Sequence, residues 1–256
     1  MKVVILAGGF GTRISEESHL KPKPMVEIGG MPILWHIMKI YSHYGLNDFI
    51  ICCGYKGYYI KEYFANYLLH MSDVTIDLQN STIETHKNSA EPWRISLIDT
   101  GLETGTAGRL QRIKPYLNDT FCMTYGDGVG NINIPALLKA HKDSASLATV
   151  TGIDIAARFG SMVIEHSKVK KFKEKPRGNN KSLVNGGFFV LEPAVFDFIS
   201  SEEEYFENGP LEKLSLEEQL SVYQHAGFWS AMDTLKDQRY LEGLWQSGEA
   251  PWKVWA

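Results

Sequence analysis

Glycines, lysines and one arginine gather near the start of the chain, in LAGGFGTR and SHLKPKPM. Glycines let the backbone approach a ligand closely, and consecutive backbone N–H groups in such a turn bind anions. Arg13 adds forked donors suited to phosphate oxygens. Lys21 and Lys23 alternate with prolines that hold the segment extended, so they should project to one side and bring one of them into a cleft. The glycine spacing matches neither a Walker loop nor GxGxxG, and from the glycines alone a plain strand-to-loop turn also stays open.

Carboxylates that suit a divalent cation lie much further along the chain. Asp127 follows the apolar segment FCMTY, at the predicted carboxyl end of a strand, where ligands collect in open α/β sheets. Mg²⁺ takes oxygen ligands, commonly one or two carboxylates plus substrate phosphates. An Asp in a GDG turn is also a common turn former, so both interpretations stay open from this segment alone. The second candidate is Asp233; Asp99 and Asp237 are weaker, and we interpret them as a turn residue and a surface residue.

The elements that position these groups are predicted by hydrophobic periodicity. Apolar strands alternate with amphipathic helices, which indicates βαβ units and a Rossmann-like, mixed, mostly parallel sheet flanked by helices. The segment 71–94 is predicted as an edge hairpin or long excursion, 103–109 as a small-residue loop, and 159–189 as shorter strands and turns. We expect one domain over residues 1–256, with an aromatic tail from about 243. The remaining predicted elements are strands at 2–6, 48–53, 95–99, 121–125, 147–152 and 222–228, and helices at 32–44, 58–69, 134–141, 193–200, 214–218 and 237–246.

Composition narrows the class of protein. The chain has 256 residues, 44% of them hydrophobic and 22% charged, which is typical of a globular protein. Its formal charge of -4 argues against a general nucleic-acid binder. The three cysteines lie in apolar runs without the spacing of a zinc site or disulfide framework, so we expect buried, reduced thiols. The first apolar run is too short for a signal peptide or membrane span, and a cytoplasmic location is the default expectation.

LAGGFGTR followed by KPKPM resembles the signature of the sugar nucleotidyltransferases, which join an NTP to a sugar 1-phosphate. The match continues in order through YGDG, FKEKP, NGGFFVL and WSAMDTLKD, and covers essentially the whole chain. It is weakest at 77–90 and 142–157. Within the family, segments such as EPW, GFW and the closing LEGLWQSGEAPWKVW most resemble the members that use CTP and glucose 1-phosphate.

The resemblance implies a Mg²⁺-dependent transfer of CMP to α-D-glucose 1-phosphate, with release of pyrophosphate. It also implies the nucleotide-diphospho-sugar transferase fold, a homo-oligomer, and a product that feeds dideoxysugar synthesis for surface polysaccharide. It implies no nucleic-acid or membrane partner. Arg13 and Lys23 would be catalytic, and Asp127 and Asp233 would hold the metal. The nucleotide contacts implied are Leu6, Ala7, Gly8, Gly9, Phe10, Gly11, Thr12, Arg13, Lys23, Thr104, Arg109 and Gly126, and the sugar-phosphate contacts are Glu174, Lys175, Asn185, Gly186 and Gly187.

Three alternatives stay open. The first is the same reaction with UTP or dTTP. The second is a metal-dependent glycosyltransferase, although such enzymes typically carry an Asp-x-Asp motif and YGDG has a single Asp. The third is a non-catalytic sugar-nucleotide sensor, which would usually have lost one of the phosphate-binding or metal-binding residues that this chain keeps.

Overall fold

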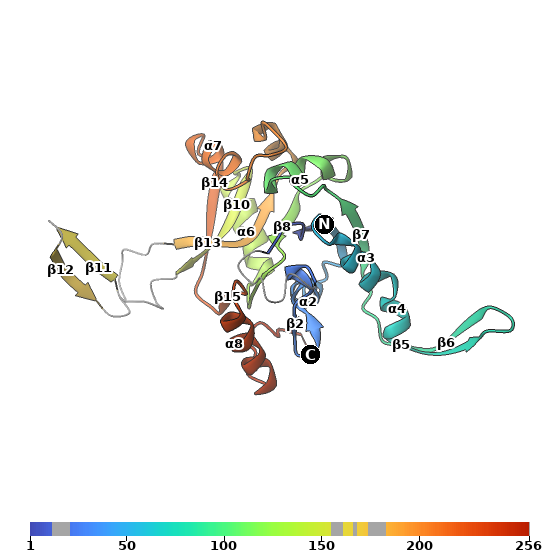
Figure 1. Ribbon diagram of the computed structural model, residues 1–256. Helices are drawn as coiled ribbons and strands as arrows, with labels where there is room; N and C mark the ends of the chain where they lie inside the picture. Colours follow the sequence, from blue (N-terminus) through green and yellow to red (C-terminus); the bar gives the residue numbers. More distant parts are fainter. Residues whose placement is uncertain (12–20, 155–160, 166–167, 174–182, 256) are drawn as a thin grey trace.

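The computed structural model describes residues 1–11, 21–154, 161–165, 168–173 and 183–255, with only the backbone for 161–165 and 168–173. A seven-stranded sheet forms the centre in the order β14-β10-β13-β8-β1-β4-β7 (Figure 1). Neighbouring strands are parallel except at β13, which is antiparallel to both β8 and β10. The predicted mixed, mostly parallel sheet is therefore confirmed. Its strands are β1 (Lys2–Leu6), β4 (Asp48–Cys53), β7 (Arg94–Asp99), β8 (Phe121–Tyr125), β10 (Ala148–Asp154), β13 (Leu183–Leu191) and β14 (Leu220–His225).

Helices cover both faces of the sheet, because its strands are apolar on both sides. Val3 and Ile5 of β1 pack on one face with α2 (Ile33–His43), α3 (Gly57–Ala65), α6 (Ile134–Ser144) and α8 (Leu235–Gln246). Val4 and Leu6 pack on the other face with α5 (Thr106–Ile113), α7 (Pro210–Leu216) and the 3₁₀ helix η4 (Pro193–Phe198). Figure 1 shows α5 and α7 above the sheet and α2 and α8 below it.

Several predicted elements differ from the structure. The predicted loop at 103–109 is wrong in its second half, because α5 begins at Thr106. The helix predicted at 58–69 is divided at Asn66 into α3 and α4 (Tyr67–His70), and the Asn66 side chain donates to the Glu62 carbonyl at 2.9 Å. The helix predicted at 214–218 begins earlier, at Pro210, a residue favoured in the first turn. The segment 193–200 forms a 3₁₀ rather than an α-helix.

Short strands pair outside the central sheet. The segment 71–94 does contain a hairpin, but β5 (Ser72–Asp77) and β6 (Thr82–Asn88) form their own two-stranded sheet, which extends away from the body (Figure 1). β11 (Ser161–Glu165) pairs with β12 (Lys168–Lys173), and β2 (Glu27–Ile28) pairs with β3 (Met31–Pro32). β9 (Gly128–Gly130) pairs with β15 (Trp229–Ala231). The remaining elements are the 3₁₀ helices η2 (Lys23–Met25) and η3 (Lys114–Tyr116).

The aromatic tail packs into the core. Trp252 is fully buried and stacks on Phe228 and Trp245. His36 is buried on α2, with Nε2 2.8 Å from the Ile28 carbonyl, while Trp252 Nε1 donates to His36 Nδ1 at 3.4 Å. One ring nitrogen therefore donates and the other accepts, as in a neutral imidazole. Burial lowers the pKa of His36 to about 4, although its backbone partners raise it.

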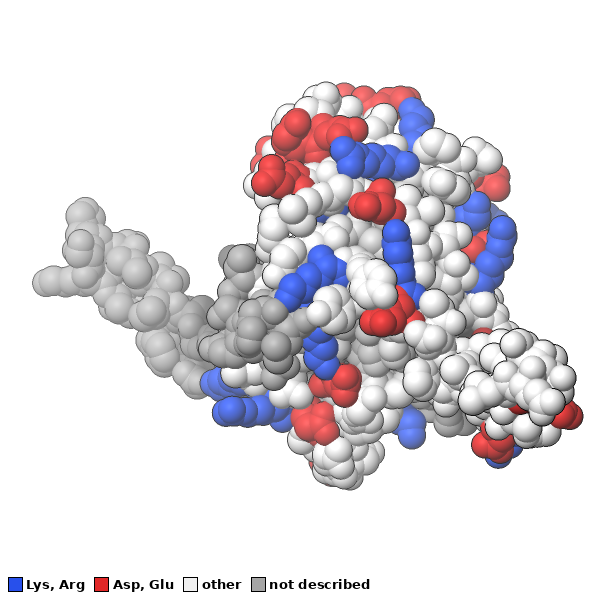
Figure 2. Space-filling model, turned by 45° about the vertical axis from the view of Figure 1, so that its right-hand side comes forward, with Lys and Arg blue, Asp and Glu red and all other residues white. Residues whose placement is uncertain are grey.

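Charges of both signs are mixed on the surface, and the cysteines are buried. Figure 2 shows blue Lys and Arg side chains interspersed with red Asp and Glu side chains on the face turned to the viewer, without a continuous basic surface. Cys52, Cys53 and Cys122 are free and buried, as predicted, and burial raises the pKa of Cys53 to about 11. Among the described residues, no helix has the length and apolar character needed to cross a membrane.

Candidate active site

A cavity of about 750 Å³ opens at the carboxyl ends of the central strands. After β1, the next two strands of the sheet along the chain, β4 and β7, lie on one side of β1. The chain then returns, and β8 lies on the other side of β1. Such a reversal leaves a crevice where ligands bind in open α/β sheets. The loop after β1 and the turn after β8 both line this cavity. The fold thus brings the glycine loop and the GDG turn to one place.

The side chain of Arg109 holds the glycine loop in position. Its side chain is only 4% exposed, and its guanidinium donates to the carbonyl oxygens of Gly8 at 2.9 Å, Gly101 at 2.7 Å and Leu102 at 3.2 Å. It also donates to Thr100 Oγ1 at 2.8 Å. Burial lowers the pKa of Arg109, but an arginine stays charged at neutral pH. One guanidinium therefore ties together the loops that follow β1 and β7.

Glycine is required at position 8 by this close approach. A Cβ on Gly8 would overlap the Arg109 guanidinium. The Gly8 carbonyl also accepts from the Tyr55 N–H at 3.1 Å, and the Ala7 N–H donates to the Cys52 carbonyl at 3.1 Å. The backbone from Ala7 to Gly8 is thus fixed by β4 and α5 before any ligand arrives.

The β9–β15 pairing brings the two predicted metal carboxylates together. Asp127 immediately precedes β9, and Asp233 is the second residue after β15. The Met232 N–H donates to the Asp127 carbonyl at 2.8 Å, which extends the backbone pairing to Asp127 and to the residue before Asp233. Asp127 and Asp233, 106 positions apart in the printed sequence, therefore lie at the same wall of the cavity.

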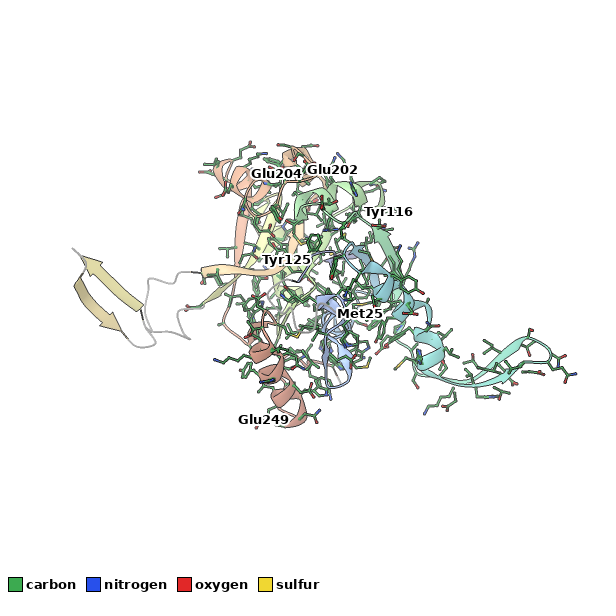
Figure 3. All side chains as sticks on the ribbon, viewed as in Figure 1. Met25, Tyr116, Tyr125, Glu202, Glu204 and Glu249 are labelled. Atoms are coloured by element: carbon green, nitrogen blue, oxygen red, sulfur yellow. The ribbon has the colours of Figure 1, made fainter. Side chains whose placement is uncertain are left out.

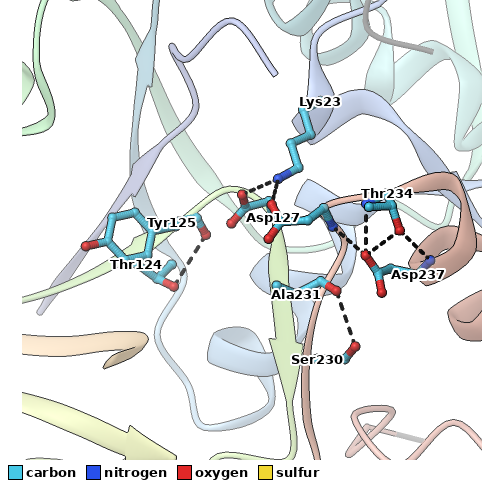
Figure 4. Close-up of polar contacts among 9 residues, drawn as sticks. Lys23, Thr124, Tyr125, Asp127, Ser230, Ala231, Thr234 and Asp237 are labelled. Carbon is cyan, nitrogen blue, oxygen red and sulfur yellow. Dashed lines mark hydrogen bonds and ion pairs between the residues drawn. The ribbon is translucent and has the colours of Figure 1, made fainter. Parts of the chain in front are cut away.

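Lys23 joins the two carboxylates (Figure 4). Its Nζ lies 2.6 Å from Asp127 Oδ2 and 2.7 Å from Asp233 Oδ1. The lysine side chain is 10% exposed, against 33% and 36% for its partners. Burial alone would lower the pKa of Lys23, but the two carboxylates outweigh burial and raise it above the ordinary value. The ammonium group is therefore charged and held between the two carboxylates at the wall of the cavity.

Asp237 binds the backbone at Asp233 in addition to capping a helix. It completes a capping box with Thr234 at the start of α8, and its Oδ2 accepts from the Asp233 N–H at 3.2 Å and the Thr234 N–H at 2.9 Å (Figure 4). A capping box satisfies backbone donors that a helix start leaves open. Our interpretation of Asp237 as a plain surface residue was therefore incomplete. Asp99 does act in a turn, accepting from the Gly101 N–H at 2.9 Å.

The two lysines of KPKP do not project to one side, contrary to prediction. Lys23 begins the 3₁₀ helix η2, so the segment is not extended beyond Pro22. Lys21 instead pairs with Glu27 at 2.7 Å, and both of those side chains are partly exposed. One lysine of the pair reaches the cavity, as expected, and the structure identifies it as Lys23.

Tyr125, which is labelled in Figure 3 and lines the cavity, belongs to a second group of polar side chains. The Tyr125 hydroxyl hydrogen-bonds Glu207, and Asn185 Nδ2 donates to that hydroxyl at 3.3 Å. Burial, together with Glu207, raises the pKa of Tyr125. Gly187 has φ +76°, and a Cβ there would press on the Tyr125 ring, so both the backbone and the packing call for glycine. The Gly186 carbonyl accepts from Trp229 Nε1 at 2.8 Å.

The structure places most of the predicted site residues around one cavity. Asn185, Gly186 and Gly187 do not line it but approach it through Tyr125. Thr12, Arg13, Glu174 and Lys175 lie outside the described residues. The predicted residues that line the cavity are Leu6, Ala7, Gly8, Gly9, Phe10, Gly11, Lys23, Thr104, Arg109, Gly126, Asp127 and Asp233.

Further cavity residues were missed from the sequence. Tyr125 could have been found, because it directly precedes Gly126 at the end of a predicted strand. Tyr205 lies in the acidic stretch SEEEYFENG, which gave no signal. Backbone bonds from Gly105 to the Glu202 carbonyl at 2.9 Å, and from Ala107 to the Glu204 carbonyl at 3.1 Å, bring this stretch to α5 (Figure 3). The missed lining residues are Pro24, Leu102, Glu103, Thr106, Tyr125 and Tyr205.

Comparison with known proteins connects this site to a family. The family model described as nucleotidyl transferase matches residues 2–237. A glucose-1-phosphate cytidylyltransferase of Salmonella typhi is 54% identical over 257 residues, covering 100% of both chains. A probable glucose-1-phosphate cytidylyltransferase of Bacillus subtilis is 46% identical over the same full lengths. A solved structure of a UDP-glucose pyrophosphorylase with UDP-glucose superposes with a TM-score of 0.68 at 16% identity, covering 96% of this chain and 98% of that one, which supports the fold.

Proposed function

This chain belongs to the nucleotidyl transferase family, and from that premise we propose that it transfers CMP from CTP to α-D-glucose 1-phosphate. The products are CDP-glucose and pyrophosphate. The choice of CTP and glucose 1-phosphate rests on the full-length identity of 54% to the Salmonella typhi cytidylyltransferase. The reaction type rests on one observation of geometry, namely that Lys23, Asp127 and Asp233 meet at the wall of the cavity formed by the glycine loop.

The step is an in-line displacement at the α-phosphorus of CTP. An oxygen of the glucose 1-phosphate phosphate group forms the new bond to phosphorus, while the bond to the β-phosphate oxygen breaks and pyrophosphate leaves. A phosphate monoester is largely dianionic at neutral pH, its second pKa being about 6. No general base is needed, so the site has to position the reactants and neutralise their charge.

The carboxylate pair fits a magnesium ion. A cation, the Lys23 ammonium, already lies within 2.7 Å of an oxygen of each carboxylate, and oxygen ligands are those that Mg²⁺ prefers. The described residues contain no group of three or more His, Cys, Asp and Glu side chains suited to a metal, which agrees with two carboxylates supplemented by substrate phosphates. Asp127 and Asp233 would hold the ion. When bound, Mg²⁺ would neutralise charge on the phosphates.

The nucleotide is assigned to the glycine-loop side of the cavity. The backbone of Leu6 to Gly11 would hold the base and ribose, together with Thr104, which lines the same cavity. Lys23 would neutralise the α-phosphate and the incoming sugar phosphate as they are brought together. Arg13, by its resemblance to the family, would hold the β- and γ-phosphates that leave. Arg109 would act mainly by fixing the loop, since its donors engage backbone carbonyls.

The sugar phosphate is assigned to the β13 side. Asn185, with Gly186 and Gly187, would form the sugar pocket beside Tyr125. Glu174 and Lys175 would bind the sugar hydroxyls and its phosphate, again by resemblance to the family. We also propose a homo-oligomer, a suggestion supported by the exposed Ile76 and Ile83, which pair across the projecting β5–β6 hairpin.

The proposal is tested by identifying the product. Purified protein is incubated with CTP, glucose 1-phosphate and Mg²⁺, and CDP-glucose is detected by mass spectrometry. Lys23→Met should lower turnover on the order of 10²-fold or more, as losses of charge-stabilising groups do. Lys21→Met is the matched control, because Lys21 pairs with Glu27 and does not line the cavity. Near-normal turnover of Lys23→Met would refute the assignment of Lys23.

A further inference from the structure

Lys23 occupies the position between the two carboxylates that a divalent cation would take. Its Nζ contacts Asp127 Oδ2 at 2.6 Å and Asp233 Oδ1 at 2.7 Å. A metal ion binding the same carboxylate pair would bring two positive charges to within a few ångströms of a third. We propose that Lys23 is an internal competitor of the metal, which keeps the affinity of the carboxylate pair for Mg²⁺ low until a nucleotide phosphate takes the lysine away.

The surroundings of Lys23 limit where else it can go. Its side chain is only 10% exposed, and its Cα is held in η2, where the Met25 N–H donates to the Pro22 carbonyl at 2.8 Å and the Val26 N–H donates to the Lys23 carbonyl at 3.1 Å. A metal ion alone would therefore have to displace a charged group from both of its carboxylate partners without offering it a new one. Charge-assisted hydrogen bonds are stronger than neutral ones, so losing both opposes metal binding.

A bound nucleotide changes this balance. The cavity that Lys23 lines also contains the glycine loop from Ala7 to Gly11, to which we assign the nucleotide. A phosphate of that nucleotide offers Lys23 a new negative partner, while the carboxylates gain the metal in exchange. Nucleotide and metal would then each favour binding of the other, and such coupling is reciprocal. Lys23 would thus act in the metal-loading step as well as in charge neutralisation. This inference rests on the proposed metal site but not on the identity of the base.

The test is the affinity of the protein for Mn²⁺ alone, measured by electron paramagnetic resonance or calorimetry without nucleotide. Lys23→Met should bind Mn²⁺ about tenfold or more tightly than the wild type, because two charge-assisted hydrogen bonds no longer oppose the metal. Lys23→Arg keeps the positive charge and should remain weak. Lys21→Met should match the wild type, and Asp127→Asn added to Lys23→Met should abolish the gain. With saturating CTP, the difference between the wild type and Lys23→Met should shrink.

A second measurement needs no substitution at Lys23. Amine acylation followed by mass spectrometry should show faster labelling of Lys23 when Mn²⁺ saturates the wild-type protein, with Lys21 unchanged. Equal or weaker Mn²⁺ binding by Lys23→Met, or unchanged labelling of Lys23, would overturn the inference. Equal affinities, with CDP-glucose made by the wild-type protein, would refute only the competition. Tighter binding by Lys23→Met, with no CDP-glucose made by the wild-type protein, would support the competition and refute the proposed function.

Discussion

Replacing Arg109 with methionine tests whether a buried guanidinium positions the nucleotide loop. Methionine keeps much of the side-chain length and removes every donor. The Gly8 carbonyl would keep the Tyr55 N–H at 3.1 Å as a partner. The carbonyls of Gly101 and Leu102 would lose the bonds of 2.7 Å and 3.2 Å that Arg109 now makes. These two acceptors are only partly buried, and an ordinary hydrogen bond contributes about 0.5–1.5 kcal/mol net, so losing both should lower the free energy of unfolding by roughly 1–3 kcal/mol.

The kinetic consequence should be confined to the nucleotide. Because Gly8 is held by Arg109 at 2.9 Å, a loosened loop should raise KM for CTP by about tenfold, with little effect on KM for glucose 1-phosphate. Urea unfolding and pyrophosphate release at varied concentrations of each substrate measure the two effects. Arg109→Lys, which restores one cationic donor group, should recover part of the stability. Unchanged stability together with an unchanged KM for CTP would refute a positioning role for Arg109.

Three further outcomes are expected. Asp127→Asn should lower turnover on the order of 10²-fold or more, measured with saturating substrates, and a variant within threefold of the wild type would exclude Asp127 as a metal ligand. Asp237→Ala should cost about 1 kcal/mol of stability through the lost helix cap, which denaturation measures. It should also raise the Mg²⁺ concentration needed for half-maximal rate, because the Asp233 backbone N–H loses its bond at 3.2 Å. An unchanged magnesium requirement in a titration would contradict this link to Asp233. His36 has a pKa of about 4 in the fold and about 6.5 unfolded, so the unfolded chain binds the proton first. Stability should therefore fall as pH drops from about 6.5 to 4, by up to roughly 3 kcal/mol from this group; unfolding of His36→Gln should show a flatter dependence, and an identical slope would contradict it.

The sequence predicted best the parts of the molecule governed by local patterns. The strand at 48–53 matches β4, and the strand at 2–6 matches β1, since continuous apolar runs bounded by turns leave little ambiguity. The start of α5 was missed because Gly105 and Gly108 weigh against a helix. Both glycines lie against the backbone of residues 202–204, where a Cβ would overlap it. Their reason is tertiary packing, which no local pattern reveals.

The candidate site also has parts that local patterns predict and parts that depend on tertiary structure. Glycine and lysine spacing identified the loop and one lysine, but which of Lys21 and Lys23 enters the cavity depends on the 3₁₀ turn at Lys23. Asp127 and Asp233 were paired through the family resemblance. Physically, two three-residue strands, β9 and β15, join them, and strands so short carry no usable periodicity. The contribution of Asp237 depends on a capping box, TLKD, whose N3 residue is Asp rather than the more usual Glu or Gln.

A panel of nucleotides tests whether the protein uses CTP. Pyrophosphate release is measured with glucose 1-phosphate and Mg²⁺ in the presence of CTP, UTP, dTTP, ATP or GTP, each added separately to the purified protein. We expect rapid release with CTP and little with the other nucleotides. Release mainly with UTP or dTTP would keep the reaction and contradict the cytidylyl assignment, and no release with any nucleotide from folded protein would contradict the proposed activity itself.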